Sequence, residues 1–244
     1  MDQDPTDSAD SPTNDAAPAP PVETKPDHPN LAAAMAAHRI ELEPAQVELL
    51  DRYRATLWRW NEQLNLTRHT TFDKFVGRDV RDTLELAKQL PQGRRVLDLG
   101  SGGGVPGVIL AVCRPDLRVT LCESVGKKAK VLQSMIDELS LPTEVFGVRV
   151  EELLQLRTFD VIVARAVAPM WKILFWLNPH WKAFDELLLI KGHSWVEERG
   201  EARHRGLLKK VDLRKIADYL MPGDPPGESV ILRLTPKGAG NQDD

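Results

Sequence analysis

The stretch VLDLGSGGGVPG, residues 96–107, contains a short apolar run, one acid and a glycine-rich turn. The apolar run is typical of a buried strand, and five of the eight residues that follow it are glycine. Because glycine has no Cβ, such a turn lets the main chain approach a bound molecule closely. Read letter by letter, Gly102, Gly104 and Gly107 match G-x-G-x-x-G, the fingerprint of dinucleotide-binding folds. The charge of the neighbouring acidic residues helps to distinguish a dinucleotide from other ligands.

Two acids near the turn favour a cationic ligand. Asp98 stands immediately before the glycines, where a carboxylate would repel a pyrophosphate across a short distance. Glu123 ends the next predicted strand, where a carboxylate accepts hydrogen bonds from both ribose hydroxyls. S-adenosyl-L-methionine has a sulfonium and an ammonium group and no phosphate, so both acids suit it as the cofactor. A tight turn with a solvent-facing Asp98 is the plain alternative, but such a turn needs fewer glycines.

Short apolar strands alternate with helices around this turn. The predicted strands are RRVLDL, DLRVTLCE, TEVFGVRV, FDVIVARAV and DELLLIKG, and the predicted helices between them are VPGVILAVC, GKKAKVLQSMIDELSL and MWKILFWLNPHW. This alternation indicates βαβ units and a mostly parallel sheet that is covered on both faces. The segments LLKKVDLRKIADYL and ESVILRLT, joined by MPGDPPG, predict a hairpin. We therefore expect an α/β, Rossmann-like fold over residues 91–236, with one antiparallel strand.

Helical spacing dominates residues 30–90. Asn30 is placed to cap LAAAMAAHRI, and Pro44 opens a longer helix. A further helical pattern runs from about residue 72 to residue 90. The longer helix has one apolar face, formed by Val47, Leu50, Tyr53, Leu57, Trp60 and Leu64. The pattern predicts an N-terminal helical subdomain.

The net charge of −4 is distributed unevenly along the 244 residues. Residues 1–29 contain seven acids against Lys25 alone, so the remainder carries about +2. We expect residues 1–29, which are also rich in proline, to be a disordered acidic tail, and residues 237–244 to be disordered as well. Two cysteines without metal-ligand spacing, no long apolar run and no leader pattern predict a cytoplasmic protein without membrane or metal.

Elimination narrows the chemistry. After the fourth strand the chain reads ARAVAPM, without the Asn/Asp-Pro-Pro-aromatic motif of amino-group methylation, and neither cysteine is placed as a nucleophile. A target that is nucleophilic when neutral, such as N7 of guanine, remains, and it needs proximity and charge screening rather than a strong base. Arg149 and Arg165 lie near strand ends, where an arginine can contact guanine O6, phosphate or cofactor. Pairing with Glu151, Glu152 or Asp160 is an equally good interpretation of these arginines.

A basic segment near the C-terminus is a candidate for RNA contact. Only Glu201 and Asp212 oppose its seven basic residues, which favours a phosphate-binding strip over a solvated helix and edge strand. These residues are Arg199, Arg203, Arg205, Lys209, Lys210, Arg214 and Lys215.

The chain resembles the bacterial small-subunit ribosomal RNA methyltransferase G family, also called glucose-inhibited division protein B. The resemblance spans about residues 47–235 and includes WNEQLNLT, VLDLGSGGGVPG, RPDLRVTLCESVGKKAKVLQ, RVEEL, FDVIVARAVA and LLIKG. It implies a class I methyltransferase fold with a seven-stranded sheet, and methyl transfer to N7 of a guanine in 16S rRNA, as naked RNA or in the small ribosomal subunit, by a monomer.

The resemblance also implies roles for individual residues. Gly100 and Val105 would line the cofactor site, with Gly102 and Gly104 in the turn, and Glu123 would hold the ribose. Val150 and Glu151 would meet the adenine. Arg165 would lie between cofactor and target base, with Arg149 and Lys191 as nearby cations, and Arg78 would contact RNA. On this basis Arg165→Ala is predicted to abolish transfer while leaving the fold intact.

Two departures from the family pattern concern the substrate side. In RDVRDT, Asp79 replaces a histidine and Thr83 a serine, and in GESVIL, Ser229 and Val230 replace an Arg-His pair. These changes leave open a second hypothesis, an RNA-binding relative with an altered target or without turnover. A nicotinamide-dependent oxidoreductase that uses the literal G-x-G-x-x-G is the third hypothesis.

Overall fold

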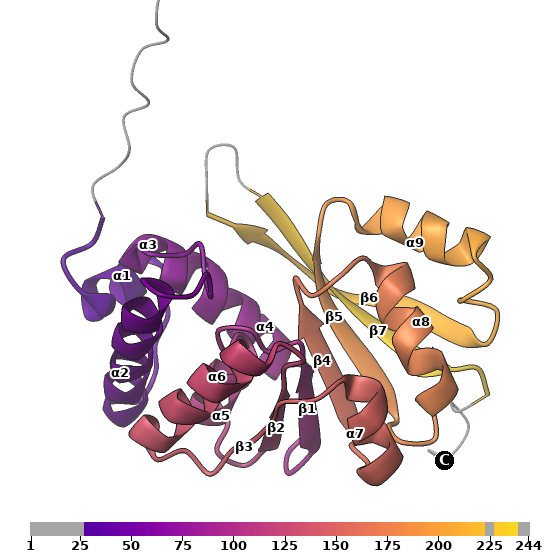
Figure 1. Ribbon diagram of the computed structural model, residues 1–244. Helices are drawn as coiled ribbons and strands as arrows, with labels where there is room; N and C mark the ends of the chain where they lie inside the picture. The colour runs from indigo at the N-terminus through magenta and orange to yellow at the C-terminus, as the bar shows by residue number, and fades with distance from the viewer. Residues whose placement is uncertain (1–26, 223–226, 239–244) are drawn as a thin grey trace, which may run out of the picture.

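A single seven-stranded sheet organises the molecule (Figure 1). The computed structural model describes residues 27–222 and 227–238. The strand order is β3-β2-β1-β4-β5-β7-β6, and β7 runs antiparallel to both of its neighbours while the other pairs are parallel. The strands are β1 Arg95–Leu99, β2 Arg118–Cys122, β3 Glu144–Phe146, β4 Val161–Arg165, β5 Glu186–Gly192, β6 Val211–Met221 and β7 Gly227–Pro236. The predicted fold class, with its terminal hairpin, is confirmed.

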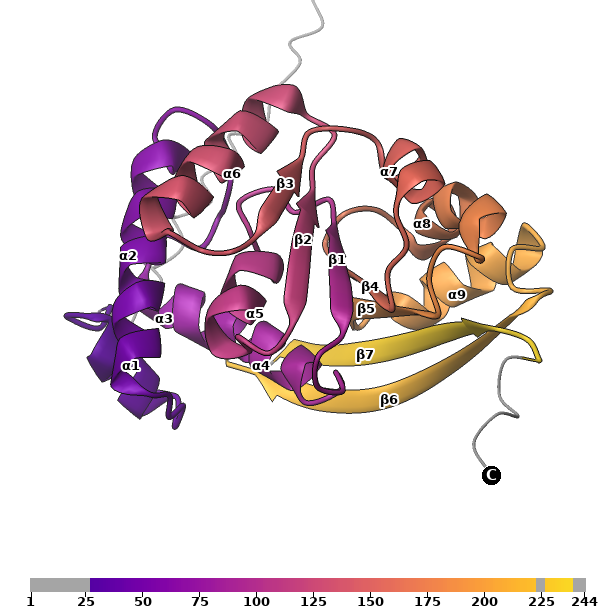
Figure 2. The same cartoon turned by 90° about the horizontal axis from the view of Figure 1, so that it is seen from below.

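Helices cover both faces of this sheet (Figure 2). In β1, Val96 belongs to one apolar cluster and Leu97 to the other, because successive side chains of a strand point to opposite faces. The first cluster includes residues of α1, α2, η1, α4, α5 and α6, and the second includes residues of α7, α8 and α9. The helices are α1 Leu31–Ala37, α2 Pro44–Asn61, α3 Phe72–Lys74, η1 Phe75–Val80 (a π-helix), α4 Arg81–Ala87, α5 Gly107–Cys113, α6 Gly126–Leu139, α7 Val150–Leu156, α8 Met170–Leu177, η2 Asn178–His180 and α9 Trp195–His204.

The N-terminal helices share the apolar cluster of α5 and α6 and form a further layer over them. Asn30 caps α1 by accepting a hydrogen bond from the Ala33 amide at 2.9 Å, as predicted. The apolar face of α2 is buried at Leu50, Tyr53 and Leu57. The Tyr53 hydroxyl also donates to the Gly103 carbonyl oxygen at 2.8 Å. Through this bond the N-terminal layer supports the glycine turn directly.

Three local predictions differ from the structure. The third strand ends at Phe146 rather than continuing to residue 150, because Arg149 caps a helix that starts at Val150. Helix α9 was missed because it buries only Ala202 and so has no apolar stripe in its sequence. Residues 27–29 belong to the ordered part, since the Asp27 carboxylate accepts hydrogen bonds from the Phe72 and Asp73 amides. The predicted tails over residues 1–26 and 239–244 lie outside the described residues.

Candidate active site

The glycine turn lies at the carboxyl end of β1, where parallel α/β sheets bind ligands. Gly100 has φ +67° and Gly104 φ +104°, a region that favours glycine. A Cβ on Gly100 would lie 2.7 Å from Val167 Cγ1, and one on Gly104 would lie 2.6 Å from Val108 Cγ2. The turn therefore requires glycine at these two positions, both for backbone conformation and for space.

The end of β2 holds the turn in place. The amides of Gly100 and Ser101 both donate to the Cys122 carbonyl oxygen, at 2.8 and 3.1 Å. Glu123 follows, and its two carboxylate oxygens accept hydrogen bonds from the Gly102 amide at 2.9 Å and the Val125 amide at 2.7 Å. Because a carboxylate has about four acceptor sites, each oxygen keeps capacity for a ligand hydroxyl.

Asp98 is buried next to the glycine turn and holds it through a hydrogen bond. Its side chain is 1% exposed, and Oδ2 accepts a hydrogen bond from the Gly107 amide at 3.1 Å. Burial raises the pKa of Asp98 to about 7, although the Gly107 hydrogen bond acts in the opposite direction. Asp98 does not line the cavity beside the turn, and its contact with the cofactor stays a prediction. The charge argument against a pyrophosphate rests on Glu123, which does line that cavity.

A cavity of about 690 Å³ opens beside the turn, within the usual range for small-molecule sites. We call it the first cavity. Of the predicted cofactor residues, those that line it are Gly100, Gly102, Val105, Glu123 and Arg165. The segment between α2 and α3 supplies the opposite wall, with Leu66, Thr67, Arg68 and His69. Gly104, also a predicted cofactor residue, belongs to the turn but does not line the first cavity.

A small pocket of about 70 Å³ adjoins the first cavity and shares Gly100, Ser124, Val167 and Trp176 with it. Val150 and Glu151, which the resemblance expects beside the adenine, line this pocket. Arg149 lines it too, although it was expected among the catalytic cations. Arg149 is the residue before α7, so its place is on the Glu151 side of the site, apart from Lys191.

A second cavity, of about 640 Å³, meets the first at His69, Arg165 and Ala166. Ala166 has φ +54°, a costly conformation for a residue with a side chain. Three cations predicted from sequence line the second cavity together: Arg78, Arg165 and Lys191. Lys191 is 9% exposed, and its Nζ donates to Glu198 Oε2 at 2.7 Å and to the Ala168 carbonyl oxygen at 2.8 Å.

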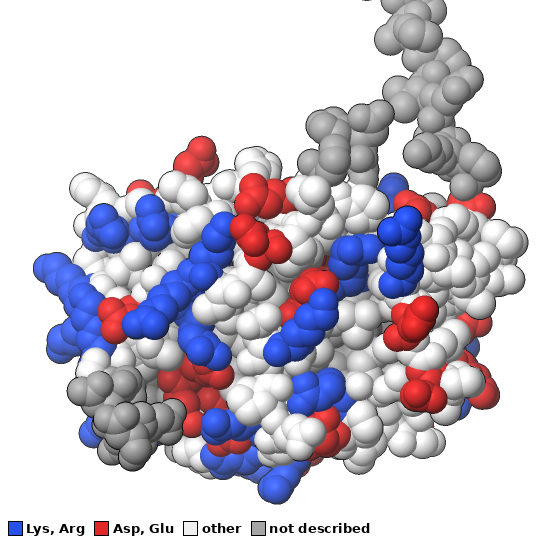
Figure 3. Space-filling view, turned by 180° about the vertical axis from the view of Figure 1, so that it is seen from behind, with Lys and Arg blue, Asp and Glu red and all other residues white. Residues whose placement is uncertain are grey.

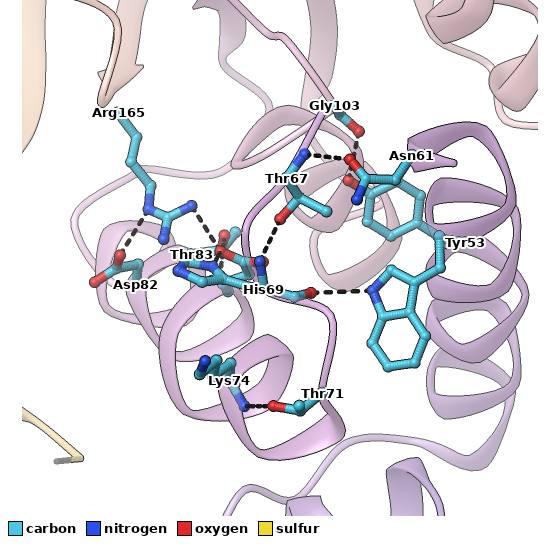
Figure 4. Close-up of polar contacts among 12 residues, drawn as sticks. Tyr53, Asn61, Thr67, His69, Thr71, Lys74, Asp82, Thr83, Gly103 and Arg165 are labelled. Carbon is cyan, nitrogen blue, oxygen red and sulfur yellow. Dashed lines mark hydrogen bonds and ion pairs between the residues drawn. The ribbon is translucent and has the colours of Figure 1, made fainter. Parts of the chain in front are cut away.

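The Arg165 guanidinium is paired with two acids that the sequence did not identify as its partners, Asp79 and Asp82 (Figure 4). Its Nη1 lies 2.8 Å from Asp79 Oδ1, and its Nε donates to Asp82 Oδ2 at 2.7 Å. Tyr219 donates to the other oxygen of Asp82 at 2.8 Å. Burial lowers the pKa of Arg165, but Asp79 and Asp82 outweigh this and raise it. The alternative partners are wrong: in the described part of the chain neither Arg149 nor Arg165 forms an ion pair with Glu151, Glu152 or Asp160, and Asp160 pairs with Arg95.

His69 is the site residue that sequence reasoning missed. Its Nδ1 lies 2.6 Å from Asp79 Oδ1, and the residue lines both cavities. The quoted motif WNEQLNLT ends two residues before it, so proximity to that motif was the available sequence signal. The two residues that replace the Arg-His pair of the family lie in different surroundings. Ser229 lines the second cavity, whereas Val230 is buried in the apolar core.

The basic segment extends away from the two cavities. Arg199 stacks on Trp195 and Arg205 on Trp171, with the guanidinium carbon 5.2 and 4.1 Å from the ring centroid. Lys209 and Lys210 directly precede β6, whose first residue Val211 pairs with Pro236 at the amino end of β5. This is the edge of the sheet opposite the glycine turn. On the face shown in Figure 3, basic side chains are interspersed with acidic ones. RNA contact by Arg199, Arg203, Arg205, Lys209 and Lys210 therefore stays a prediction for a surface separate from the cavities.

Two further observations concern metal and membrane. Among the described residues, His28, His38 and Asp73 each bring one potential ligand atom to within 4.8 Å of the others. A hydrogen bond of 2.9 Å between His38 and Asp73 accounts for the closest of these contacts without an ion. Within residues 27–222 and 227–238, no helix is both long and apolar enough to cross a membrane.

The strand order, the antiparallel β7, the glycine turn after β1 and the acid after β2 define a class I, Rossmann-like methyltransferase. A solved O-methyltransferase from Bacillus cereus, in complex with SAH, has this fold: its TM-score is 0.55 at 16% identity, over 84% of this chain and 97% of that one. A family model, rRNA small subunit methyltransferase G, matches residues 46–220. The chain belongs to this family, as the resemblance predicted.

Individual relatives agree with this family. A ribosomal RNA small subunit methyltransferase G from Rhodopirellula baltica is 50% identical over 217 residues, which is 82% of this chain and 94% of the relative. A protein of the same description from Chromobacterium violaceum is 41% identical over 170 residues, 69% of this chain and 81% of the relative. Membership of this family makes the protein a methyltransferase, and the oxidoreductase hypothesis is wrong.

Proposed function

We propose that this protein transfers the methyl group of S-adenosyl-L-methionine to N7 of a guanine in 16S rRNA. One observation carries the proposal: the first cavity, with the glycine turn and Glu123, shares Arg165 and Ala166 with a second cavity lined by Arg78 and Lys191. A cofactor site and an adjoining cavity of similar volume, lined by both cations and acids, suit a small methyl donor and a nucleotide.

The residues of the first cavity fit the proposed cofactor. The Glu123 oxygens would accept hydrogen bonds from the ribose hydroxyls, Val150 and Glu151 would border the adenine, and Gly100 to Val105 would enclose the methionine moiety. When bound, this cofactor supplies an electrophilic methyl group on a cationic sulfur. The turn carries no basic side chain from Gly100 to Gly107, which avoids repulsion of that charge.

The charges at the junction suit N7 as the acceptor. N7 of guanine attacks through its lone pair and has no proton to lose, so the site needs orientation rather than a strong base. Transfer moves positive charge from the cofactor sulfur to the guanine ring. An unpaired arginine would oppose this movement, but Asp79 and Asp82 give the Arg165 cluster two carboxylates for one guanidinium. Arg165 is therefore held in position by Asp79 and Asp82, and these two carboxylates offset its positive charge.

The cations of the second cavity suit an RNA backbone. Arg78 and Lys191 both line the second cavity, which supports contact with phosphate groups flanking the target base. Such contacts orient a nucleic acid without reading its sequence. We propose that the partner is 16S rRNA or the small ribosomal subunit, and that the protein acts as a cytoplasmic monomer without a metal ion.

A methyl-transfer assay tests this function. Purified full-length protein with labelled S-adenosyl-L-methionine should label 16S rRNA or unmethylated small subunits, and digestion should yield N7-methylguanosine. Label in another base would reject N7 of guanine as the target. No transfer to either substrate by protein that binds S-adenosylhomocysteine would instead support the RNA-binding hypothesis without turnover.

A further inference from the structure

We propose that His69 is a target-binding residue: its Nε2 accepts a hydrogen bond from N1–H of the guanine that is methylated. The inference rests on the proposed function and adds to it how the base is recognised. His69 is one of three residues that line both the first and the second cavity, so it borders the space proposed for the target base. Its side chain is 26% exposed, so part of it is accessible.

The segment that carries His69 is held in place by the end of α2 (Figure 4). Asn61 Oδ1 accepts hydrogen bonds from the amides of Leu66 and Thr67, at 2.8 and 2.9 Å. Thr67 Oγ1 accepts one from the His69 amide at 2.9 Å, and Trp58 Nε1 donates to the His69 carbonyl oxygen at 3.0 Å. The backbone of His69 is thus fixed from both sides before any ligand binds, which lowers the entropy cost of using its ring.

Asp79 determines which ring nitrogen is available. A carboxylate only accepts hydrogen bonds, so the 2.6 Å contact between Nδ1 and Asp79 Oδ1 places the proton of a neutral imidazole on Nδ1. Nε2 is then an acceptor. The same Asp79 oxygen also binds Arg165, and Asp82 continues the network to Tyr219. The ring is therefore oriented by a network whose other members are buried or half-buried.

An acceptor at this place distinguishes guanine from adenine. Guanine presents a donor at N1 and adenine presents an acceptor there, so Nε2 pairs with guanine only. The contact also uses the edge of the base opposite N7 and leaves N7 free to face the cofactor. Methylation at N7 makes the ring cationic and its N1–H a stronger donor. The hydrogen bond to His69 is consequently stronger in the transition state than in the ground state, which is the condition for raising kcat.

The departure at residue 79 supports the same inference. The resembling family has histidine where this chain has Asp79, so this chain lacks an imidazole at that position. The imidazole of His69 lies directly against the replacing carboxylate. The substitution therefore removes a histidine from η1 while the structure places another at the boundary of the same cavity.

The test compares His69→Leu, His69→Gln and wild-type protein on unmethylated small subunits. Leucine has no acceptor, and we expect kcat to fall roughly 10- to 100-fold with unchanged affinity for S-adenosylhomocysteine and unchanged melting temperature. The glutamine carbonyl oxygen accepts from N1–H, so His69→Gln should recover at least about half of the lost activity on a logarithmic scale. His180→Ala, on η2 outside both cavities, is the matched control and should behave as wild type.

The outcomes separate this inference from the proposed function. If wild-type protein does not methylate guanine N7, the proposed function fails. If it does, and His69→Leu retains the wild-type kcat, the role of His69 alone is overturned. The role is also overturned if His69→Gln is as inactive as His69→Leu, or if both lose stability and cofactor affinity, because His69 then acts through the fold.

Discussion

The glycine turn and the junction of the two cavities are built in opposite ways. The turn is one short piece of chain, residues 98–107, and its shape comes from glycine conformations and from hydrogen bonds of its own main-chain groups, some of them to the side chains of Tyr53 and Glu123. The junction unites side chains from four separate parts of the sequence, which are held by ion pairs. The glycine turn should therefore be most sensitive to substitutions within residues 98–107 that alter its own backbone. A dispersed site depends on every partner, because each buried charge needs its counter-charge.

The largest expected effect is that of Arg165→Ala. This substitution leaves Asp79 and Asp82 buried without their cation, and we expect the free energy of unfolding to fall by about 3–5 kcal/mol. The sequence-based expectation of an intact fold is therefore replaced by one of lost stability together with lost transfer. Urea denaturation measures the change. Arg149→Ala, at an exposed residue, is the control and should shift stability by less than about 0.5 kcal/mol. Equal stability of both variants would contradict the ion-pair cluster.

The acid beneath the turn should make stability depend on pH. The pKa of Asp98 is about 7 in the folded protein and 3.8 in the reference state, so the folded state binds the proton more tightly. Its contribution to stability is fully present below pH 3.8 and is lost as the pH rises through 7. Relative to wild type, Asp98→Asn should gain on the order of 2–3 kcal/mol between pH 5 and pH 8.

Denaturation curves at pH 5 and pH 8 measure this gain. Asp185→Asn, at a side chain that is 76% exposed, is the control and should keep the wild-type pH dependence. Parallel curves for wild type and Asp98→Asn would show that Asp98 stays ionised under the turn.

A change in the turn itself should act mainly on cofactor affinity. In Gly100→Ala the new Cβ meets Val167 at 2.7 Å, at a residue whose φ is +67°. We expect binding of S-adenosylhomocysteine, measured by calorimetry, to weaken roughly 10- to 100-fold. Gly126→Ala is the control, because it is the same substitution at a position where the new Cβ has no non-neighbouring atom of the described structure within 4 Å. This variant should bind S-adenosylhomocysteine with wild-type affinity. A turn that tolerates Gly100→Ala would not be the rigid element described above.

The smallest effect is expected at the basic segment. Lys209 and Lys210 lie at the sheet edge opposite the turn, so the double substitution Lys209→Ala/Lys210→Ala should change methyl transfer by less than about twofold at physiological salt. Arg78→Ala, in the second cavity, should lower transfer about tenfold under the same conditions. A larger loss from the lysine pair than from Arg78 would place the main RNA contact at the far edge.

The sequence by itself determined the sheet, the turn and the cofactor side of the site. Strand periodicity and glycine positions are local properties, and the carboxyl ends of parallel strands must meet at one edge, so the sequence alone predicts that Glu123 lies beside the glycine turn. Local patterns failed where a helix buries almost no side chain, as in α9, and where a short strand is soon followed by α7.

Only the tertiary structure decided the substrate side. Asp82 and Arg165 are separated by 83 positions, and Tyr219 by a further 54 from Arg165, so no spacing rule connects them. Burial also changed roles that residue type alone suggested: Asp98 lies under the turn, Arg165 is neutralised by acids, and His69 faces both cavities. The sequence determines which functional groups are present. Burial and the choice of partner set the charge and the accessibility of each group, and they arise only when distant segments pack together.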